Sequence, residues 1–258
     1  MNFPRIAAAA ALLAPVLLVL AAPVPALAAS ADITFPAQNW SFNGPFGTFD
    51  RASAQRGFQV YSESCAACHG LRHVYYRDLQ GIGLDAAQIE AIAAAVQVPA
   101  VGDDGQLTER AGLPSDRFRA PYPNERAARA AFNGAYPPEL SVMVKARPGG
   151  ADQLYALLTG YTDPPAGVAV GDGMYYNKYY AGHQIAMPSP LNDGQVTYAD
   201  GTRASVEQMA RDVTTFLAYT AEPHMEARKR MGVKVILFLI FMTGITYAVK
   251  RKVWADVH

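Results

Sequence analysis

The sequence has very little cysteine: Cys65 and Cys68 are the only two among 258 residues, and they stand three positions apart. With no other thiol, the chain cannot form a four-cysteine zinc site. If both thiols serve one local motif, no disulfide remains to connect distant segments. The domain must then be stabilised by its hydrophobic core and by whatever the two cysteines hold.

The chain also lacks an overall charge excess, because 22 basic residues balance 22 acidic ones. The charges are, however, unevenly distributed along the chain. Residues 29–227 hold 21 acidic and 14 basic residues, a net charge of −7, and the remaining cations lie mostly in the C-terminal segment. An acidic domain of this kind attracts basic soluble partners and repels nucleic acid, so we predict no nucleic-acid binding. The alternative explanation is that this net charge simply keeps the domain soluble.

What is present is a short motif, Cys65-Ala66-Ala67-Cys68-His69. Two cysteines at i and i+3 lie on one face of a helical turn, so both sulfurs can reach the two vinyl groups of one porphyrin. The histidine then lies under the ring, where its imidazole can bind iron. A redox-active dithiol and half of a zinc site are the alternatives. The adjoining histidine favours one covalently attached haem c.

The N-terminus has the pattern of a cleaved secretory signal peptide over residues 1–28. Arg5 precedes an apolar run over residues 6–22, and an Ala-x-Ala pattern ends at Ala28. A permanent membrane helix is the alternative, which the prolines at positions 23 and 25 disfavour. We therefore predict that residues 29–227 are exported, as thioether attachment outside the cytoplasm requires.

A second apolar stretch covers residues 231–249. At about 1.5 Å per residue it is long enough to cross the roughly 30 Å hydrocarbon core of a bilayer. Basic triplets at 228–230 and 250–252 bracket it, which would be unusual for a buried core helix. We predict a single-pass anchor over 228–252 in a bacterial inner membrane. Cations on both flanks leave the orientation undecided. The predicted signal peptide decides it: the haem domain would lie in the periplasm, and residues 253–258 would form a short cytoplasmic tail.

Between these ends the periodicity predicts a mainly α domain with long loops. Expected helices begin after Asp50, at Asp85, after Asn124, at Pro137-Pro138, at Ala151 and after Ser205. We expect residues 101–120 to be a surface insertion loop and residues 161–201 to be a second long loop, rich in proline and glycine.

Iron bound by one histidine has either an open site or a second axial ligand. Met187 is the first candidate, because it lies in a loop before the last domain helix and the prolines at 188 and 190 stiffen the backbone. His183 is the next. Arg126 and Arg129 lie on an alanine-rich surface, where an arginine favours an anion such as a haem propionate. Either arginine could equally be exposed to solvent.

Together these motifs resemble the cytochrome c1 family, of bacterial type. The resemblance extends over nearly all of the mature chain. It rests on FGTFDRASAQRG (46–57), the Cys65–His69 motif, Tyr76-Arg77, PYPNERAARAAFNGAYPPEL (121–140), MPSPL (187–191) and EARKRMGVKV (226–235). In the methionine motif, Ser189 stands where the family usually has a third proline.

The resemblance implies a mainly α, class I cytochrome c-like haem domain with long loop insertions, plus one C-terminal transmembrane helix. It implies that Cys65 and Cys68 form the thioethers, that His69 and Met187 bind the iron, and that Arg129 pairs with a propionate. The implied function is that of an electron-transfer subunit of quinol–cytochrome c oxidoreductase, an enzyme complex in which this chain performs no bond chemistry.

The resemblance further implies the partners: cytochrome b, a Rieske iron–sulfur protein and a soluble cytochrome c, in a dimeric complex within the membrane. Two alternatives stay open. A free-standing, membrane-tethered c-type cytochrome could donate electrons to an oxidase or a photosynthetic centre. A haem enzyme such as a peroxidase would need an open distal site.

Overall fold

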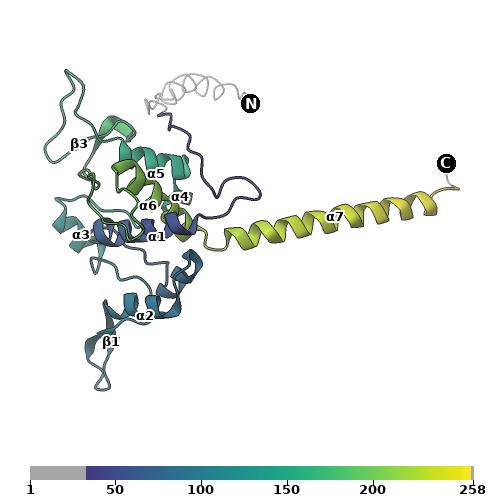
Figure 1. The fold of residues 1–258 in the computed structure, drawn as a ribbon, viewed down its shortest axis with the longest axis horizontal. Helices are drawn as coiled ribbons and strands as arrows, with labels where there is room; N and C mark the ends of the chain where they lie inside the picture. The colour runs from purple at the N-terminus through teal and green to yellow at the C-terminus, as the bar shows by residue number, and fades with distance from the viewer. Residues whose placement is uncertain (1–32, 257–258) are drawn as a thin grey trace, which may run out of the picture. The chain divides into compact units, whose positions relative to one another are not determined.

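The computed structural model describes residues 33–256. The predicted signal peptide, residues 1–28, lies outside the described residues. The helices are α1 (Arg51–Val60), α2 (Ala86–Ala94), α3 (Glu125–Ala131), α4 (Met143–Ala146), α5 (Gly150–Thr159), α6 (Val206–Ala221) and α7 (Met225–Val253). Three short helices, η1 (Tyr61–Cys65), η2 (Tyr76–Ile82) and η3 (Ala181–His183), and two hairpins complete the described fold (Figure 1). The prediction of a mainly helical domain followed by one long apolar helix is confirmed.

Helix α1 begins where the sequence predicts. The side chain of Asp50 accepts a hydrogen bond from the Ser53 backbone N–H at 3.1 Å and caps the helix. The helix continues without a break into η1, a π-helical turn that ends at Cys65. The continuous α1–η1 rod thus carries the first cysteine of the motif on a rigid element.

Helix α6 forms the centre of the core. Its apolar stripe, formed by Met209, Val213, Phe216 and Leu217 at helical spacing, is buried. It crosses α1 closely at Gly57, where a Cβ atom would lie 2.0 Å from the backbone oxygen of Asp212. Only glycine permits this approach, so α1 and α6 pack backbone against backbone.

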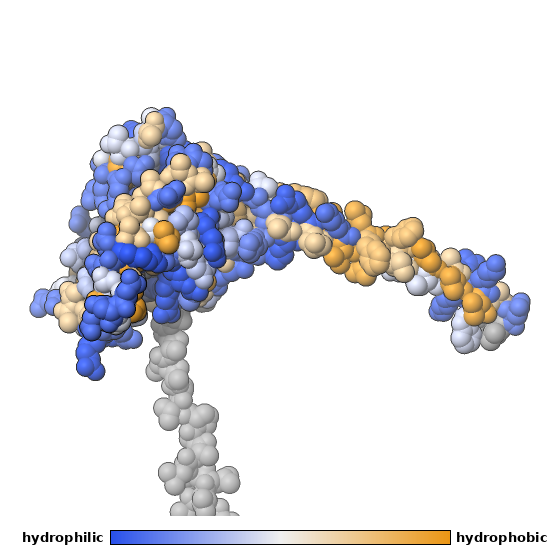
Figure 2. Space-filling model, turned by 90° about the horizontal axis from the view of Figure 1, so that it is seen from below, coloured by the Kyte–Doolittle hydropathy of each residue, from blue (hydrophilic) through white to orange (hydrophobic). Residues whose placement is uncertain are grey.

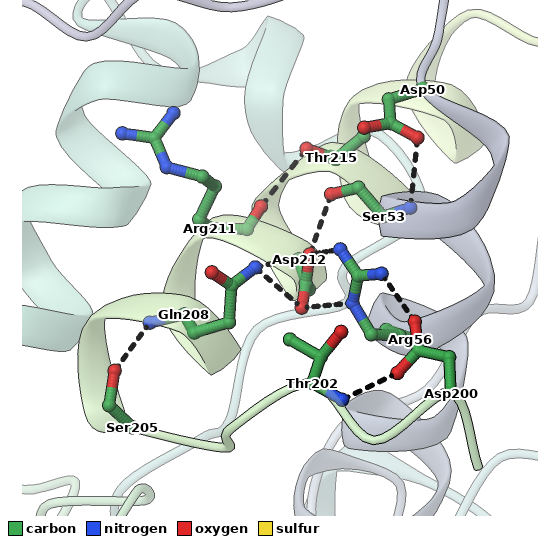
Figure 3. A network of polar contacts seen from close by, with 10 residues as sticks. All are labelled: Asp50, Ser53, Arg56, Asp200, Thr202, Ser205, Gln208, Arg211, Asp212 and Thr215. Carbon is green, nitrogen blue, oxygen red and sulfur yellow. Dashed lines mark hydrogen bonds and ion pairs between the residues drawn. The ribbon is translucent and has the colours of Figure 1, made fainter. Parts of the chain in front are cut away.

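A buried polar network crosses the same α1–α6 interface (Figure 3). The carboxylate of Asp212 is fully buried and receives two hydrogen bonds from Arg56, at 2.9 and 3.0 Å. The Ser53 hydroxyl donates to it at 2.7 Å, and the Gln208 amide donates at 3.1 Å. Arg56 also pairs with Asp200 at 2.8 Å, so α1, α6 and the loop before α6 are joined through one guanidinium.

Helix α2 begins after the cap at Asp85, as predicted. The predicted loop over residues 101–120 is partly wrong, because residues 97–101 (β1) and 107–111 (β2) form an antiparallel hairpin. Most of the hairpin is exposed, so its strands give no alternating apolar pattern by which they could be predicted. Phe118, which follows the hairpin, is buried in the core.

Helix α3 is capped by Asn124, as predicted, and α5 begins one residue before the predicted Ala151. The prediction that Pro137-Pro138 opens a helix is wrong. Residues 137–140 are irregular, and α4 begins only at Met143. The backbone carbonyl of Pro138 instead contacts the ring of His69.

Residues 161–201 are mostly irregular, as predicted, with a small hairpin of β3 (Tyr175–Tyr176) and β4 (Gln184–Ile185). Asn177 follows β3 and is fully buried. Its amide donates to the carbonyl of Leu157 and its side-chain oxygen accepts from the Tyr179 N–H, at 2.8 and 2.9 Å. The buried amide therefore anchors this long loop to α5.

Helix α7 is the one helix within residues 33–256 that is long and apolar enough to cross a membrane. It begins three residues before and ends one residue after the predicted segment 228–252. The apolar side chains between positions 235 and 249 are exposed, and Figure 2 shows them as a hydrophobic surface along the helix. A helix with this exposed apolar surface fits a membrane anchor.

Candidate functional site

The three motif residues stand on one tight turn at the end of η1. The carbonyl of Cys65 accepts hydrogen bonds from the backbone N–H groups of Cys68, at 3.1 Å, and His69, at 2.9 Å. Both cysteines are free thiols and are half-buried. The turn therefore presents two sulfurs and one imidazole within five residues of a rigid helical end.

The thiol of Cys65 does not have the lowered pKa of a redox-active cysteine. Burial raises the pKa of Cys65 to about 12, and the neighbouring Cys68 adds to the increase. A catalytic dithiol needs a thiol whose pKa is lowered, so that the thiolate forms near neutral pH. Within residues 33–256, no group of three or more His, Cys, Asp or Glu side chains is arranged to hold a metal ion. Both observations disfavour the dithiol and zinc alternatives.

The imidazole of His69 has the orientation that an axial ligand needs. Its Nδ1 lies 2.7 Å from the carbonyl oxygen of Pro138, and a carbonyl can only accept a hydrogen bond. Nδ1 therefore carries the proton, and the lone pair of Nε2 remains for a metal. Burial lowers the pKa of His69, although the bond to Pro138 partly opposes this effect, so the ring is neutral at neutral pH. The donor set fits the iron of a haem.

Two further hydrogen bonds hold the backbone around this imidazole. The hydroxyl of Tyr61 donates to the carbonyl of His69 at 3.0 Å. The N–H of Leu140 donates to the carbonyl of Gly70, also at 3.0 Å. The Leu140 bond and the Pro138–His69 bond fix residues 138–140 against the turn at two points, and the Tyr61 bond holds the backbone of His69 itself.

Met187 is half-buried in the long loop before α6. Its carbonyl accepts a hydrogen bond from the hydroxyl of Tyr161 at 3.1 Å. Further along, Leu191 is buried in the core, and Gln195 donates to the hydroxyl of Ser64 at 2.9 Å. The loop that carries Met187 is therefore tied to the residue beside Cys65. Its role as the iron ligand stays a prediction.

His183, the other candidate for the sixth ligand, is engaged within its own hairpin. Its ring stacks on Tyr176 with centroids 5.8 Å apart, and its Nδ1 lies 3.3 Å from the carbonyl of Asn177. Its backbone has a φ of 58°, which is uncommon for a residue with a side chain. These contacts make His183 a weaker candidate than Met187.

Arg129 is exposed on α3 and already has partners. It forms an ion pair with Glu125 at 2.7 Å, donates to the carbonyl of Gly134 at 2.7 Å, and lies over the ring of Tyr136. A propionate would have to compete with these groups. Arg126, on the same helix, is also exposed. The assignment of Arg129 as propionate partner stays a prediction.

Sequence reasoning missed the groups that position the candidate ligands. Tyr61, Tyr161 and the carbonyl of Pro138 contact residues that are 8, 26 and 69 positions away in the chain. No local pattern encodes contacts of this kind. The proline pair was the one visible signal, and it marks an irregular, stiff segment whose carbonyl is directed at His69.

Comparison with known proteins identifies relatives over most of the chain. A model of the family described as Cytochrome C1 family matches residues 40–257. The chain is 42% identical over 257 residues to "Cytochrome c1" of Rhodospirillum rubrum, covering 93% of this chain and 94% of that protein. It is 47% identical over 224 residues to "Cytochrome b-c1 complex catalytic subunit, mitochondrial" of Candida albicans, covering 86% of this chain and 78% of that protein.

A third relative is "Cytochrome b/c1" of Bradyrhizobium diazoefficiens, which is 48% identical over 246 residues. The match covers 86% of this chain but 36% of that protein, so the chain spans little more than a third of this relative.

Proposed function

Since this chain belongs to the cytochrome c1 family, we propose that it is the haem-bearing, electron-transferring subunit of quinol–cytochrome c oxidoreductase, the cytochrome b-c1 complex. The observation that carries the proposal is the family match over residues 40–257, which includes the turn where Nε2 of His69 is left available for iron. The chain would receive electrons from a Rieske iron–sulfur protein and pass them to a soluble cytochrome c.

In this proposal one haem c is attached through Cys65 and Cys68. His69 and Met187 would bind its iron, and Arg129 would pair with a propionate. When bound, the haem supplies a one-electron couple. The residues of this chain would hold it: the turn fixes both sulfurs, Pro138 sets the tautomer of His69, and the loop that carries Met187 would occupy the remaining iron position and keep other ligands out.

We further propose that α7 anchors the chain as a single pass in a bacterial inner membrane. Residues 29–227 would lie in the periplasm after removal of residues 1–28, with residues 253–258 on the cytoplasmic side. Cytochrome b and the Rieske protein would be its companions in a dimeric complex. The exposed apolar side chains of α7 and its basic flanks support the anchor.

The test is purification from native membranes in mild detergent by a tag on this chain. We expect a cytochrome b and an iron–sulfur protein to co-purify, with quinol-dependent reduction of added cytochrome c. Acid–acetone extraction should leave the haem on the polypeptide. Isolation as a single polypeptide that retains its haem would contradict membership of the complex and favour a free-standing cytochrome.

A second experiment tests how the distal loop is held. Tyr161→Phe removes one hydroxyl, leaving the Met187 carbonyl without its donor, at a cost of about 0.5–1.5 kcal/mol. We therefore expect the reduced protein to bind carbon monoxide roughly threefold to tenfold more readily, with the haem still attached. Tyr175→Phe, an exposed tyrosine of the same loop, is the matched control. Equal binding by the two variants would show that this hydroxyl does not restrain the ligand.

A further inference from the structure

A groove lies between the loop that precedes α1 and the first turns of α7. The loop contributes Phe46 and Gly47, and the helix contributes Lys229, Arg230, Val233 and Lys234. The helical residues lie on one face, because positions three and four apart are neighbours on a helix. The groove is therefore lined both by apolar side chains and by cations.

The loop wall is fixed in place, and its aromatic side chain is left uncovered. The ammonium group of Lys229 donates to the carbonyls of Phe42, at 2.7 Å, and Gly47, at 3.2 Å, and so ties the loop to α7. Phe46 at the tip of this loop is 81% exposed. An aromatic side chain held rigidly in this exposed position favours contact with an apolar or amphipathic partner.

The acidic residue in the lining of the groove, Glu226, acts electrostatically on Arg230 but forms its ion pair elsewhere. It is paired with Arg51 at 2.9 Å and also accepts from the Phe49 N–H. Within the described residues, Arg230 and Lys234 form no ion pair. Two cations that lie one helical turn apart and form no ion pair can hold an anionic group between them.

The position of the groove along the helix selects the kind of anion. Val233 and Lys234 lie at the start of the apolar stretch 231–249, and Figure 2 shows the change from hydrophilic to hydrophobic surface along α7. If α7 is the anchor proposed above, the groove lies at headgroup depth on the exported side of the membrane. Lysine and arginine stems can extend along apolar surface at this depth while the charge stays hydrated.

We propose that this groove binds an anionic phospholipid from the exported leaflet. Arg230 and Lys234 hold the phosphate, and an acyl chain lies along Val233 and against Phe46. A protein segment is the other possible kind of occupant. The lipid is favoured because the groove joins the membrane-facing surface of α7 directly, and because its cations match a phosphate.

The experiment uses the purified full-length protein, with its companions, in nanodiscs that contain photoactivatable phosphatidylglycerol. We expect lipid adducts on peptides from residues 42–48 and 226–234. Arg230→Gln with Lys234→Gln should reduce adducts on the 42–48 peptide by at least about tenfold, since each cation near an anionic headgroup contributes about a factor of five. The matched control, Lys250→Gln with Lys252→Gln, removes the same charge at the other end of α7 and should leave these adducts unchanged.

Two outcomes would overturn the proposal. Equal labelling by photoactivatable phosphatidylcholine would show an apolar surface without preference for an anion. A photo-crosslinking amino acid at position 46, tested in native membranes, should likewise yield a lipid adduct, and a polypeptide adduct would instead identify a protein interface. Alkaline carbonate extraction separates these results from a failure of the anchor, because an anchored chain stays with the membrane whether or not the groove binds lipid.

Discussion

Met187→Leu should leave the haem covalently attached while lowering the midpoint potential, by on the order of a hundred millivolts or more. Leucine is close to methionine in volume, so the loop can keep its packing, but it has no sulfur to donate to iron. The distal position then opens, and the reduced protein should bind carbon monoxide. Potentiometric titration and the carbon monoxide difference spectrum measure the two effects.

Met174→Leu is the matched control, because Met174 is half-buried in the same long loop and is not placed in the site. It should change neither the potential nor ligand binding. If Met187→Leu behaves in the same way as this control, Met187 is not the ligand. His183→Gln then becomes the informative variant, although the ring of His183 would first have to leave Tyr176.

The features that could be predicted from the sequence are those with a local physical cause. Asp50, Asp85 and Asn124 cap helices because each side chain accepts a backbone hydrogen bond from three residues ahead. The apolar stripe of α6 follows from helical periodicity alone. The motif at Cys65 predicts a site because its residues are adjacent, so no tertiary information is needed to bring them together.

The missed features depend on contacts between distant segments. Pro137-Pro138 has the signature of a helix start. The carbonyl of Pro138 instead accepts a hydrogen bond from His69, whereas in a helix it would accept one from the backbone N–H four residues ahead. Most of the β1–β2 hairpin is exposed and only Val98 is buried, so the strands have no alternation of apolar residues that would indicate them. The distal position of Met187 rests on family resemblance and loop chemistry, because the sequence alone does not fix how a long loop folds back.

Asp212 is the clearest example of a residue whose partners are distant in the sequence and therefore could not be predicted. It lies among the apolar residues of α6. A charged residue in an amphipathic helix is ordinarily found on the face that is exposed to solvent. Instead its carboxylate is fully buried, because Arg56, Ser53 and Gln208 together supply its hydrogen bonds. The pairing with Asp212 raises the pKa of Arg56, so the arginine stays charged at every accessible pH. Nothing in the sequence near position 212 reveals these partners.

Asp212→Ala should therefore destabilise the domain by about 3–5 kcal/mol, the usual cost of leaving one partner of a buried ion pair without the other. The guanidinium of Arg56, whose side chain is 16% exposed, would lose its buried acceptor, and the Ser53 hydroxyl would lose its own. The α1–α6 interface that carries the Cys65 turn would loosen with it. Urea unfolding of the detergent-solubilised full chain, followed by the fluorescence of the buried Trp40, measures the loss.

Asp200→Asn provides the control, because Asp200 pairs with the same guanidinium from the surface, where its side chain is 46% exposed. Solvent and salt screen that pair, so its loss should destabilise the domain far less than the loss of Asp212 does. A double variant, Asp212→Leu with Arg56→Met, removes both charges and should recover part of the stability that Asp212→Ala loses. If Asp212→Ala and Asp200→Asn had equal small effects, the buried pair would not hold α1 against α6, and the close approach at Gly57 would have to do so alone.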